Sequence, residues 1–116
     1  MPVSNKENEF TAYVVDLMQS IGPVQAKAMF GGHGIFLEGL MFALVAESVL
    51  YFKVDKNTEN EFKAKGLEAF TYYKKGKEYK MSYYQAPEEA LDDSEEMNFW
   101  AAKAYQTALR AAAKKR

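Results

Sequence analysis

The chain has 116 residues, the length of one ordinary domain, and 48% of them are hydrophobic, enough for a single core. It contains no cysteine, which excludes disulfides, thiol catalysis and cysteine-ligated metal centres and favours a reducing cytoplasm. A net charge of −1 excludes a molecule-wide positive field that would attract nucleic acid or anionic lipid. We expect one domain spanning residues 1–116.

The amino-terminal segment 1–9 lacks the basic start and apolar core of a signal peptide. No apolar run approaches the roughly 20 residues that a membrane-spanning helix needs, and the longest candidate, 40–45, has the length of a strand. These features predict a soluble cytoplasmic protein without membrane contact.

A first helix is predicted to begin near Asn5, because Ser4 and Glu7 have the spacing of a capping box. Apolar residues then recur at helical spacing and form one face: Phe10, Val14, Leu17, Met18 and Ile21. The pair Gly22-Pro23 ends the helix, since proline cannot continue it.

Four short β-prone runs follow, at residues 25–30, 35–37, 40–46 and 49–54. Glu38-Gly39 and Glu47-Ser48 are tight enough for hairpin turns, so these runs predict an antiparallel meander. Asp55 or Asn57 can then cap a short helix that runs through Lys65. Within that helix Phe62 is expected to face inward, and Gly66 stops it.

Residues 70–74 and 78–84 predict a second hairpin, which turns at Gly76. A last helix is expected from about Ser94 to Ala113, with a stripe of small residues below one large aromatic: Met97, Trp100, Ala101, Ala104, Ala108 and Ala111. The order α-β-β-β-β-α-β-β-α predicts an α+β two-layer sandwich, an antiparallel sheet with flanking helices.

Three segments resemble the N-terminal domain of the TfoX/Sxy family, the bacterial regulators of natural competence. They are Met29-Phe30-Gly31-Gly32-His33-Gly34, Met41-Phe42-Ala43-Leu44 and Leu50-Tyr51-Phe52-Lys53-Val54-Asp55, and Trp100 in an alanine-rich last helix fits the same pattern. The resemblance implies a non-enzymatic regulatory protein of the fold given above. It also implies a stand-alone first domain, without the C-terminal domain of full-length competence regulators.

The glycine-rich segment Gly31-Gly32-His33-Gly34 allows positive φ and close backbone approach, as phosphate-binding loops require. Such loops lead into a helix, whereas this one leads into a strand, so we favour a bulged hairpin turn whose glycines avoid clashes. His33 is the only histidine, and no second nitrogen or sulfur ligand accompanies it. We expect its ring to satisfy loop backbone groups or face solvent, with no metal or cofactor bound.

An acidic cluster precedes the last helix: Glu88, Glu89, Asp92, Asp93, Glu95 and Glu96. It lacks the alternating spacing of a calcium loop. We interpret it as negative charge that favours the helix N-terminus.

The second hairpin carries Lys74, Lys75, Lys77 and Lys80 beside Tyr72, Tyr73, Tyr83 and Tyr84. Lysines interleaved with aromatic rings are typical of single-strand nucleic-acid grooves. Lysines on edge strands also deter edge-to-edge pairing, and tyrosines are ordinary strand residues. Nucleic-acid contact is therefore the alternative function rather than the favoured one.

The runs 41–45 and 49–54 show little polar alternation, so both of their faces can be buried. Either a protein partner or a second copy of the chain covers the face away from the helices, or helices cover both faces. No catalytic triad, P-loop or dinucleotide motif is readable, and we expect no enzyme activity. The sequence thus predicts a regulatory module that acts through protein–protein contact in transcription.

Overall fold

The structure is a computed structural model that describes residues 5–29 and 31–114. Its helices are α1 (Asn5–Leu17), α2 (Glu59–Ala64) and α3 (Ser94–Lys114), with short 3₁₀ turns η1 (Gln19–Ile21) and η2 (Glu88–Leu91). Its strands are β1 (Gln25–Met29), β2 (Gly32–Leu37), β3 (Leu40–Ala46), β4 (Val49–Lys53), β5 (Ala69–Lys74) and β6 (Lys77–Gln85). The predicted α+β order is confirmed.

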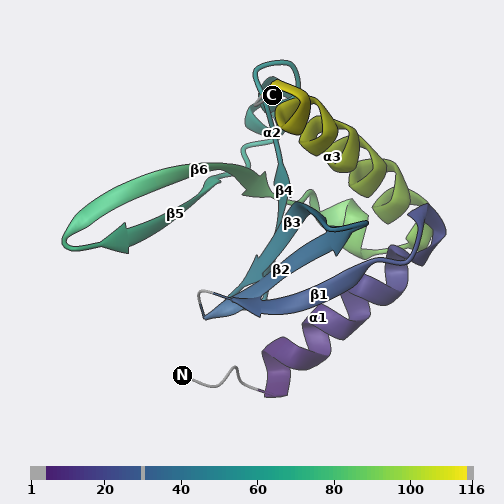
Figure 1. The fold of residues 1–116 in the computed structure, drawn as a ribbon. Helices are drawn as coiled ribbons and strands as arrows, with labels where there is room; N and C mark the ends of the chain where they lie inside the picture. Colours follow the sequence, from purple (N-terminus) through teal and green to yellow (C-terminus); the bar gives the residue numbers. More distant parts are fainter. Residues whose placement is uncertain (1–4, 30, 115–116) are drawn as a thin grey trace.

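The six strands form one antiparallel sheet in the order β1-β2-β3-β4-β6-β5. The predicted meander is its first four strands, and the second hairpin joins it because β6 pairs with β4. Figure 1 shows α1 and α3 on one side of the sheet, while the outer part of the β5–β6 hairpin projects away from both helices. The fold has two layers, and no helix of the described chain lies on the second face.

The core lies between the sheet and the helices. Val14 of α1 and Met18, which directly follows that helix, are fully buried there, as the helical spacing predicts. From α3 the buried side chains are Met97, Trp100, Ala101, Ala104, Thr107 and Ala108. Phe62 of α2 also points inward and meets the Trp100 ring edge-on, with centroids 5.3 Å apart. Small alanines let α3 approach the sheet closely, and the two large rings fill the space that remains.

The first helix ends differently from the prediction. It stops at Leu17, and one 3₁₀ turn, η1, carries the chain on to Gly22, whose φ of 141° suits glycine. The capping-box residue Ser4 lies outside the described residues. Its proposed partner Glu7 accepts a hydrogen bond from the backbone N–H of Ser48, 3.2 Å away, and so reaches the β3–β4 turn.

Two irregularities shape the sheet. Between β2 and β3 the register shifts at Ile35 and Phe36, so β3 carries one extra residue. Between β5 and β6 it shifts again at Ala69 and Thr71. Beyond this second shift β6 pairs only with β5, so a two-stranded ribbon extends past the sheet edge.

The buried strand β3 corrects one expectation. Phe42, Ala43, Leu44 and Val45 are all inaccessible to solvent, so both faces of this strand are buried. The described helices cover one face only. On the other face side chains of the sheet itself do the covering, since the ends of Met29 (β1), Phe36 (β2) and Met41 (β3) gather over Gly34, the β2 partner of Leu44. Burial of this strand therefore requires neither a partner chain nor helices on both sides.

Membrane insertion through a helix has no support in the described chain, where none of the helices combines the length and apolar character that crossing a bilayer requires.

Candidate interaction surfaces

The glycine-rich segment is a strand rather than a loop. Gly32, His33 and Gly34 belong to β2, and only Gly31, with a φ of 76°, lies in the turn before it. Phe30 lies outside the described residues. A Cβ on Gly32 would stand 2.2 Å from the Val45 carbonyl oxygen, so the predicted role of avoiding clashes is confirmed although the predicted loop is wrong.

His33 also differs from the expectation. Its ring neither faces solvent nor satisfies loop backbone, because β2 turns it toward α1. Nδ1 lies 3.3 Å from the Thr11 hydroxyl and 3.9 Å from the Glu7 carboxylate, and the side chain is 13% exposed. The ring thus links the sheet to the first helix, which is a structural contact.

Asp55 supports two elements at once. Its Oδ1 accepts hydrogen bonds from the backbone N–H groups of Asn57 and Thr58, at 2.9 and 3.1 Å, so Asp55 and not Asn57 supports the turn into α2. Its Oδ2 accepts hydrogen bonds from both Nε and Nη2 of Arg110, a residue of α3. Burial alone would raise the pKa of Asp55, but the Arg110 guanidinium and the two N–H groups outweigh it and lower the pKa.

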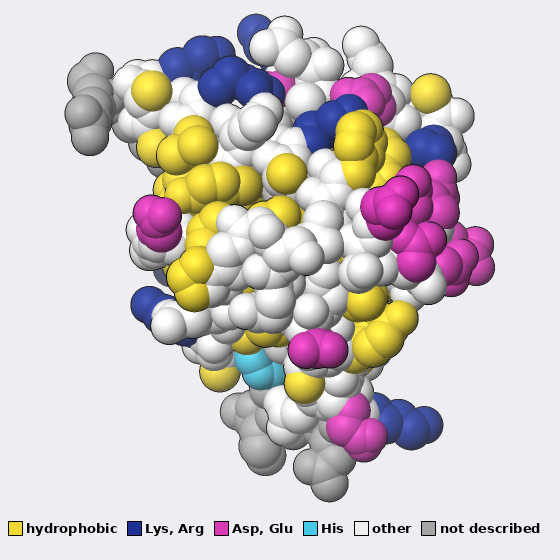
Figure 2. Space-filling view, turned by 90° about the vertical axis from the view of Figure 1, so that its right-hand side faces the viewer, with side chains coloured by type: hydrophobic (Ala, Val, Ile, Leu, Met, Phe, Trp, Pro, Cys, Tyr) yellow, Lys and Arg dark blue, Asp and Glu magenta, His cyan; other side chains and the backbone are white. Residues whose placement is uncertain are grey.

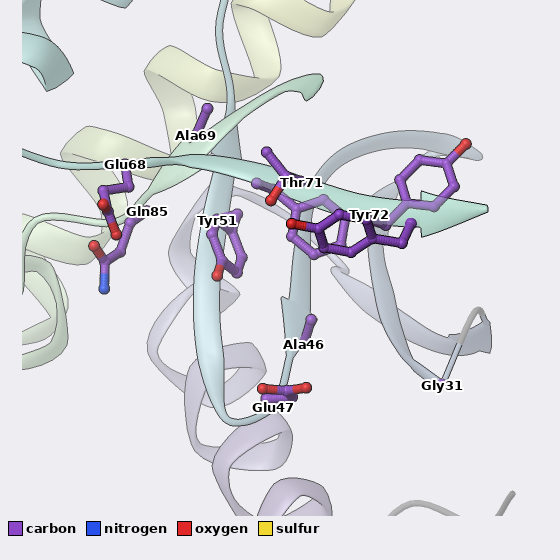
Figure 3. Close-up of a pocket in the computed structure, with 11 residues that line it drawn as sticks. Gly31, Ala46, Glu47, Tyr51, Glu68, Ala69, Thr71, Tyr72 and Gln85 are labelled. Atoms are coloured by element: carbon purple, nitrogen blue, oxygen red, sulfur yellow. The ribbon is translucent and has the colours of Figure 1, made fainter. Parts of the chain in front are cut away.

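A hollow of about 590 Å³ lies on the face of the sheet that no helix covers. It opens between the β5–β6 hairpin and the turns β1–β2 and β3–β4, and Figure 3 shows the residues that line it. We call it the aromatic groove, because it is lined by Tyr51, Phe70, Tyr72 and Tyr73, together with Gly31, Ala46, Glu47, Glu68, Ala69, Thr71 and Gln85.

The rings of the aromatic groove form a continuous ladder. Tyr51 meets Phe70 edge-on at 5.0 Å between centroids, and Phe70 stacks on Tyr72 at 6.5 Å. Tyr72 then stacks on Tyr79 across the hairpin at 5.5 Å. The ladder runs from the sheet out along the ribbon, where Tyr72 and Tyr79 are 41% and 43% exposed. Apolar surface is therefore offered to solvent on a preformed support.

The aromatic groove has a negative character. Glu47 and Glu68 line it, and none of its described lining residues is a lysine or an arginine. The pKa of Tyr51 is raised, first by burial and then by the negative charges of Glu47 and Glu68. The carboxylates of Glu47 and Glu68 would also act on a group bound in the groove.

The four hairpin lysines do not form one surface. Lys74, Lys75 and Lys77 lie at the exposed tip of the ribbon, around the turn Lys75-Gly76. Lys80 lies further back, where it lines a second hollow beside α2 and the end of α3. Lys80 therefore lies on a different part of the surface from the other three lysines. The spacing of the four lysines in the sequence does not show this difference.

Part of the acidic cluster lies at the start of α3, with Glu95 and Glu96 in its first turn. The Asp93 carboxylate accepts a hydrogen bond from the backbone N–H of Glu96 at 2.8 Å, and Glu89 pairs with Lys65 at the same distance. The electrostatic interpretation is supported, and within the described chain no three His, Asp or Glu side chains are placed to hold a metal ion. Figure 2 shows a dense group of acidic side chains on the right, with basic side chains directly above it and along the top.

The sequence matches the model of the TfoX N-terminal domain over residues 16–108. The chain belongs to the TfoX N-terminal domain family. It is also 30% identical over 86 residues to the DNA transformation protein TfoX1 of Aliivibrio fischeri. That match covers 74% of this chain but 39% of the relative, so the chain spans less than half of that protein's length.

Seen on the structure, the motifs that resemble the TfoX family have different tasks. Gly32, Gly34, His33 and Trp100 hold the fold together. Tyr51 and Gly31 line the aromatic groove, whereas Lys53 and Asp55 line the second hollow. Sequence reasoning missed Glu47, Glu68 and Phe70 as groove residues, because a hairpin that pairs with a distant strand brings them together.

Proposed function

We propose that this TfoX N-terminal domain is a non-catalytic, cytoplasmic regulatory module that acts in transcription by binding another protein in the aromatic groove. The observation that carries the proposal is the ladder Tyr51–Phe70–Tyr72, held on the face of the sheet that the helices leave uncovered. Exposed aromatic side chains on a rigid support are typical anchors of protein interfaces. The family membership and the name of the Aliivibrio fischeri relative support a competence-related setting.

The chemistry of the groove specifies the kind of partner. Its aromatic floor attracts apolar and cationic side chains, and the carboxylates of Glu47 and Glu68 favour a positive charge beside that floor. The partner should therefore present a segment that carries arginine or lysine next to apolar residues. An acidic segment would meet like charge and bind poorly.

The first test uses synthetic peptides as probes. A ten-residue peptide of alternating arginine and leucine should shift the amide resonances of Tyr51, Phe70 and Tyr72, and its glutamate–leucine counterpart should not. Glu68→Gln should weaken binding of the cationic peptide by about threefold, the usual scale of a partly exposed charge contact. Glu38→Gln, in the β2–β3 turn outside the groove, is the matched control and should change nothing.

The second test uses the protein partner itself. Cross-linking in the producing cells should recover a transcriptional regulator with the wild type and with Phe99→Ala, an exposed aromatic of α3. Tyr72→Ala should lose that regulator. Solution mass distinguishes a second copy of this chain from a different protein. The proposal would be contradicted if the Tyr72→Ala variant recovered the regulator as well as the wild type does, or if the wild type recovered no regulator.

Nucleic-acid binding through the hairpin 72–84 is the alternative function. The exposed cations at its tip favour it, since Lys74, Lys75 and Lys77 stand beside the exposed rings of Tyr73 and Tyr79. Three phosphate contacts would make the affinity for single-stranded DNA fall steeply with salt. The test measures binding at 50 and 200 mM salt with the wild type and with Lys74→Gln/Lys75→Gln. An affinity that changes neither with salt nor with the double substitution would rule out this alternative.

A further inference from the structure

The second hollow, about 620 Å³ in volume, lies where the root of the hairpin meets α2 and the end of α3. Five of its lining residues are lysines from different segments of the chain: Lys53 (β4), Lys56 (the turn before α2), Lys63 (α2), Lys80 (β6) and Lys114 (α3). We call it the basic hollow. Such a gathering is notable in a chain whose net charge is −1.

The two carboxylates of the basic hollow are already engaged. The Asp55 carboxylate accepts two hydrogen bonds from the Arg110 guanidinium, at 3.0 and 3.1 Å. Glu59 accepts a hydrogen bond from the Tyr84 hydroxyl at 3.0 Å and faces Lys63 at 3.7 Å. Neither carboxylate forms a described ion pair with Lys56, Lys80 or Lys114.

Three of the lysines present a positive charge that a ligand can reach. Lys56, Lys80 and Lys114 are exposed and form no ion pair with any residue that the structure describes. Like charges that surround one concavity repel one another, and an anion placed among them relieves that repulsion. Lysine binds phosphate as a point charge with three donors.

We propose that the basic hollow binds a compact ligand with two or more adjacent phosphate groups. The positions of the cations favour a compact ligand over a nucleic-acid strand. They surround one depression from five segments, and the tip residues Lys74, Lys75 and Lys77 do not line it. A strand needs cations laid along a track, whereas a pyrophosphate or triphosphate group needs them converging on one point.

This site is separate from the protein-binding groove in its chemistry and in its test. The groove lacks a lysine or arginine among its described lining residues, and the hollow carries five lysines. Failure of peptide binding would leave the phosphate site untouched, and the reverse holds as well.

The experiment measures binding of inorganic tripolyphosphate, ATP and a single-stranded 12-mer to the full chain by calorimetry. Tripolyphosphate should bind the wild type, and Lys56→Gln/Lys80→Gln should weaken it about tenfold, because two charged contacts are lost. Lys74→Gln/Lys75→Gln is the matched control, with the same charge change on the hairpin that carries Lys80, and should weaken it less than about twofold by screened attraction alone. Lys80→Arg should retain most of the affinity.

The three probes separate the sources of the phosphate. ATP binding more tightly than tripolyphosphate supports a nucleotide ligand, and equal affinity supports recognition of the phosphates alone. The proposal is overturned if neither binds at millimolar concentration, or if both double variants weaken binding equally. It is also overturned if the 12-mer binds most tightly and loses affinity with Lys74→Gln/Lys75→Gln. Unchanged thermal melting of the variants establishes that they are folded.

Discussion

Single residues of β2 decide how closely the strands approach. Gly32 has the Val45 carbonyl oxygen within 2.2 Å of the position its Cβ would take, and backbone cannot swing aside. A Cβ on Gly34 would instead stand 2.5 Å from the Met29 sulfur and 2.8 Å from a ring carbon of Phe36, and these side-chain ends can shift more easily than backbone. At Gly31 a Cβ would meet no other atom within 4 Å, but the backbone has a positive φ of 76°. Three nearby glycines are thus required for three different physical reasons.

Alanine substitutions should rank these reasons. Gly32→Ala should lower the free energy of unfolding by about 3 kcal/mol, since the added methyl group meets rigid backbone. Gly31→Ala should cost about 1 kcal/mol, the strain of a left-handed conformation. Gly34→Ala should fall between them. Urea unfolding of the three variants gives the comparison, and a Gly32→Ala cost no larger than that of Gly31→Ala would contradict the ranking.

Tyr83 predicts a loss of stability at alkaline pH. Burial raises the pKa of its hydroxyl to about 12, whereas the pKa of a tyrosine in the unfolded chain is about 10. The unfolded chain therefore releases this proton first, so the stabilising contribution is complete below pH about 10 and falls as the pH rises toward 12.

Between pH 9 and pH 11 this difference should cost about 1 kcal/mol. Tyr83→Phe should lose correspondingly less stability over that interval, as measured by urea unfolding at both pH values. Other tyrosines contribute equally to both proteins, so the difference between them isolates Tyr83. Identical losses would show that Tyr83 titrates normally in the folded state.

At the scale of the elements, the β5–β6 hairpin has two parts with different duties. Near the sheet, Tyr84 of β6 is buried, packs on Phe62 and donates its hydroxyl hydrogen bond to Glu59. Further out, Tyr79 on the same strand is 43% exposed and stacks on Tyr72 of the same ribbon. The outer ribbon is therefore built for contact rather than for stability.

A pair of substitutions on β6 tests this division. Tyr84→Ala should cost about 3 kcal/mol of unfolding free energy, because it empties a large core position. Tyr79→Ala should cost about 1 kcal/mol, the value of an exposed aromatic contact. Equal costs in urea unfolding would mean that the ribbon is part of the cooperative core.

Local sequence patterns predicted most elements of the fold but not how distant ones meet. The spacing of Val14 and Met18, the turn at Glu38-Gly39 and the stop at Gly66 are local signals, and each matches the structure. Pairing of β6 with β4 joins residues about thirty positions apart, and no local pattern encodes it. The groove and the hollow both depend on that pairing, so their full residue sets could not be read from the sequence.

At the scale of the whole molecule, α3 has a packing part and an exposed end. The last buried residue among those described in the helix is Ala108, and beyond it Arg110 ties the helix to Asp55. Lys114 then reaches the basic hollow. The matched family region ends at the same place, residue 108. The core is thus complete before the helix ends.

A chain that stops after Leu109 should therefore fold. It loses the Arg110–Asp55 pair, worth about 1 kcal/mol, and its melting temperature should fall by about 5 °C. Its affinity for tripolyphosphate should also fall, because Lys114 is gone. Circular dichroism melts and calorimetry measure the two effects. Loss of the folded state on truncation would show that the core depends on the last turns.

The wall between the two hollows has a thermodynamic consequence. Ala69 of β5 lines both of them, and on β4 Tyr51 of the groove is two residues from Lys53 of the hollow. If a ligand on one side changes affinity on the other, linkage requires the effect to be equal in both directions. A cationic peptide that tightens tripolyphosphate binding threefold must itself be bound threefold more tightly by the phosphate-loaded protein. One short stretch of strand would then make the domain a coincidence detector, responsive to two signals together.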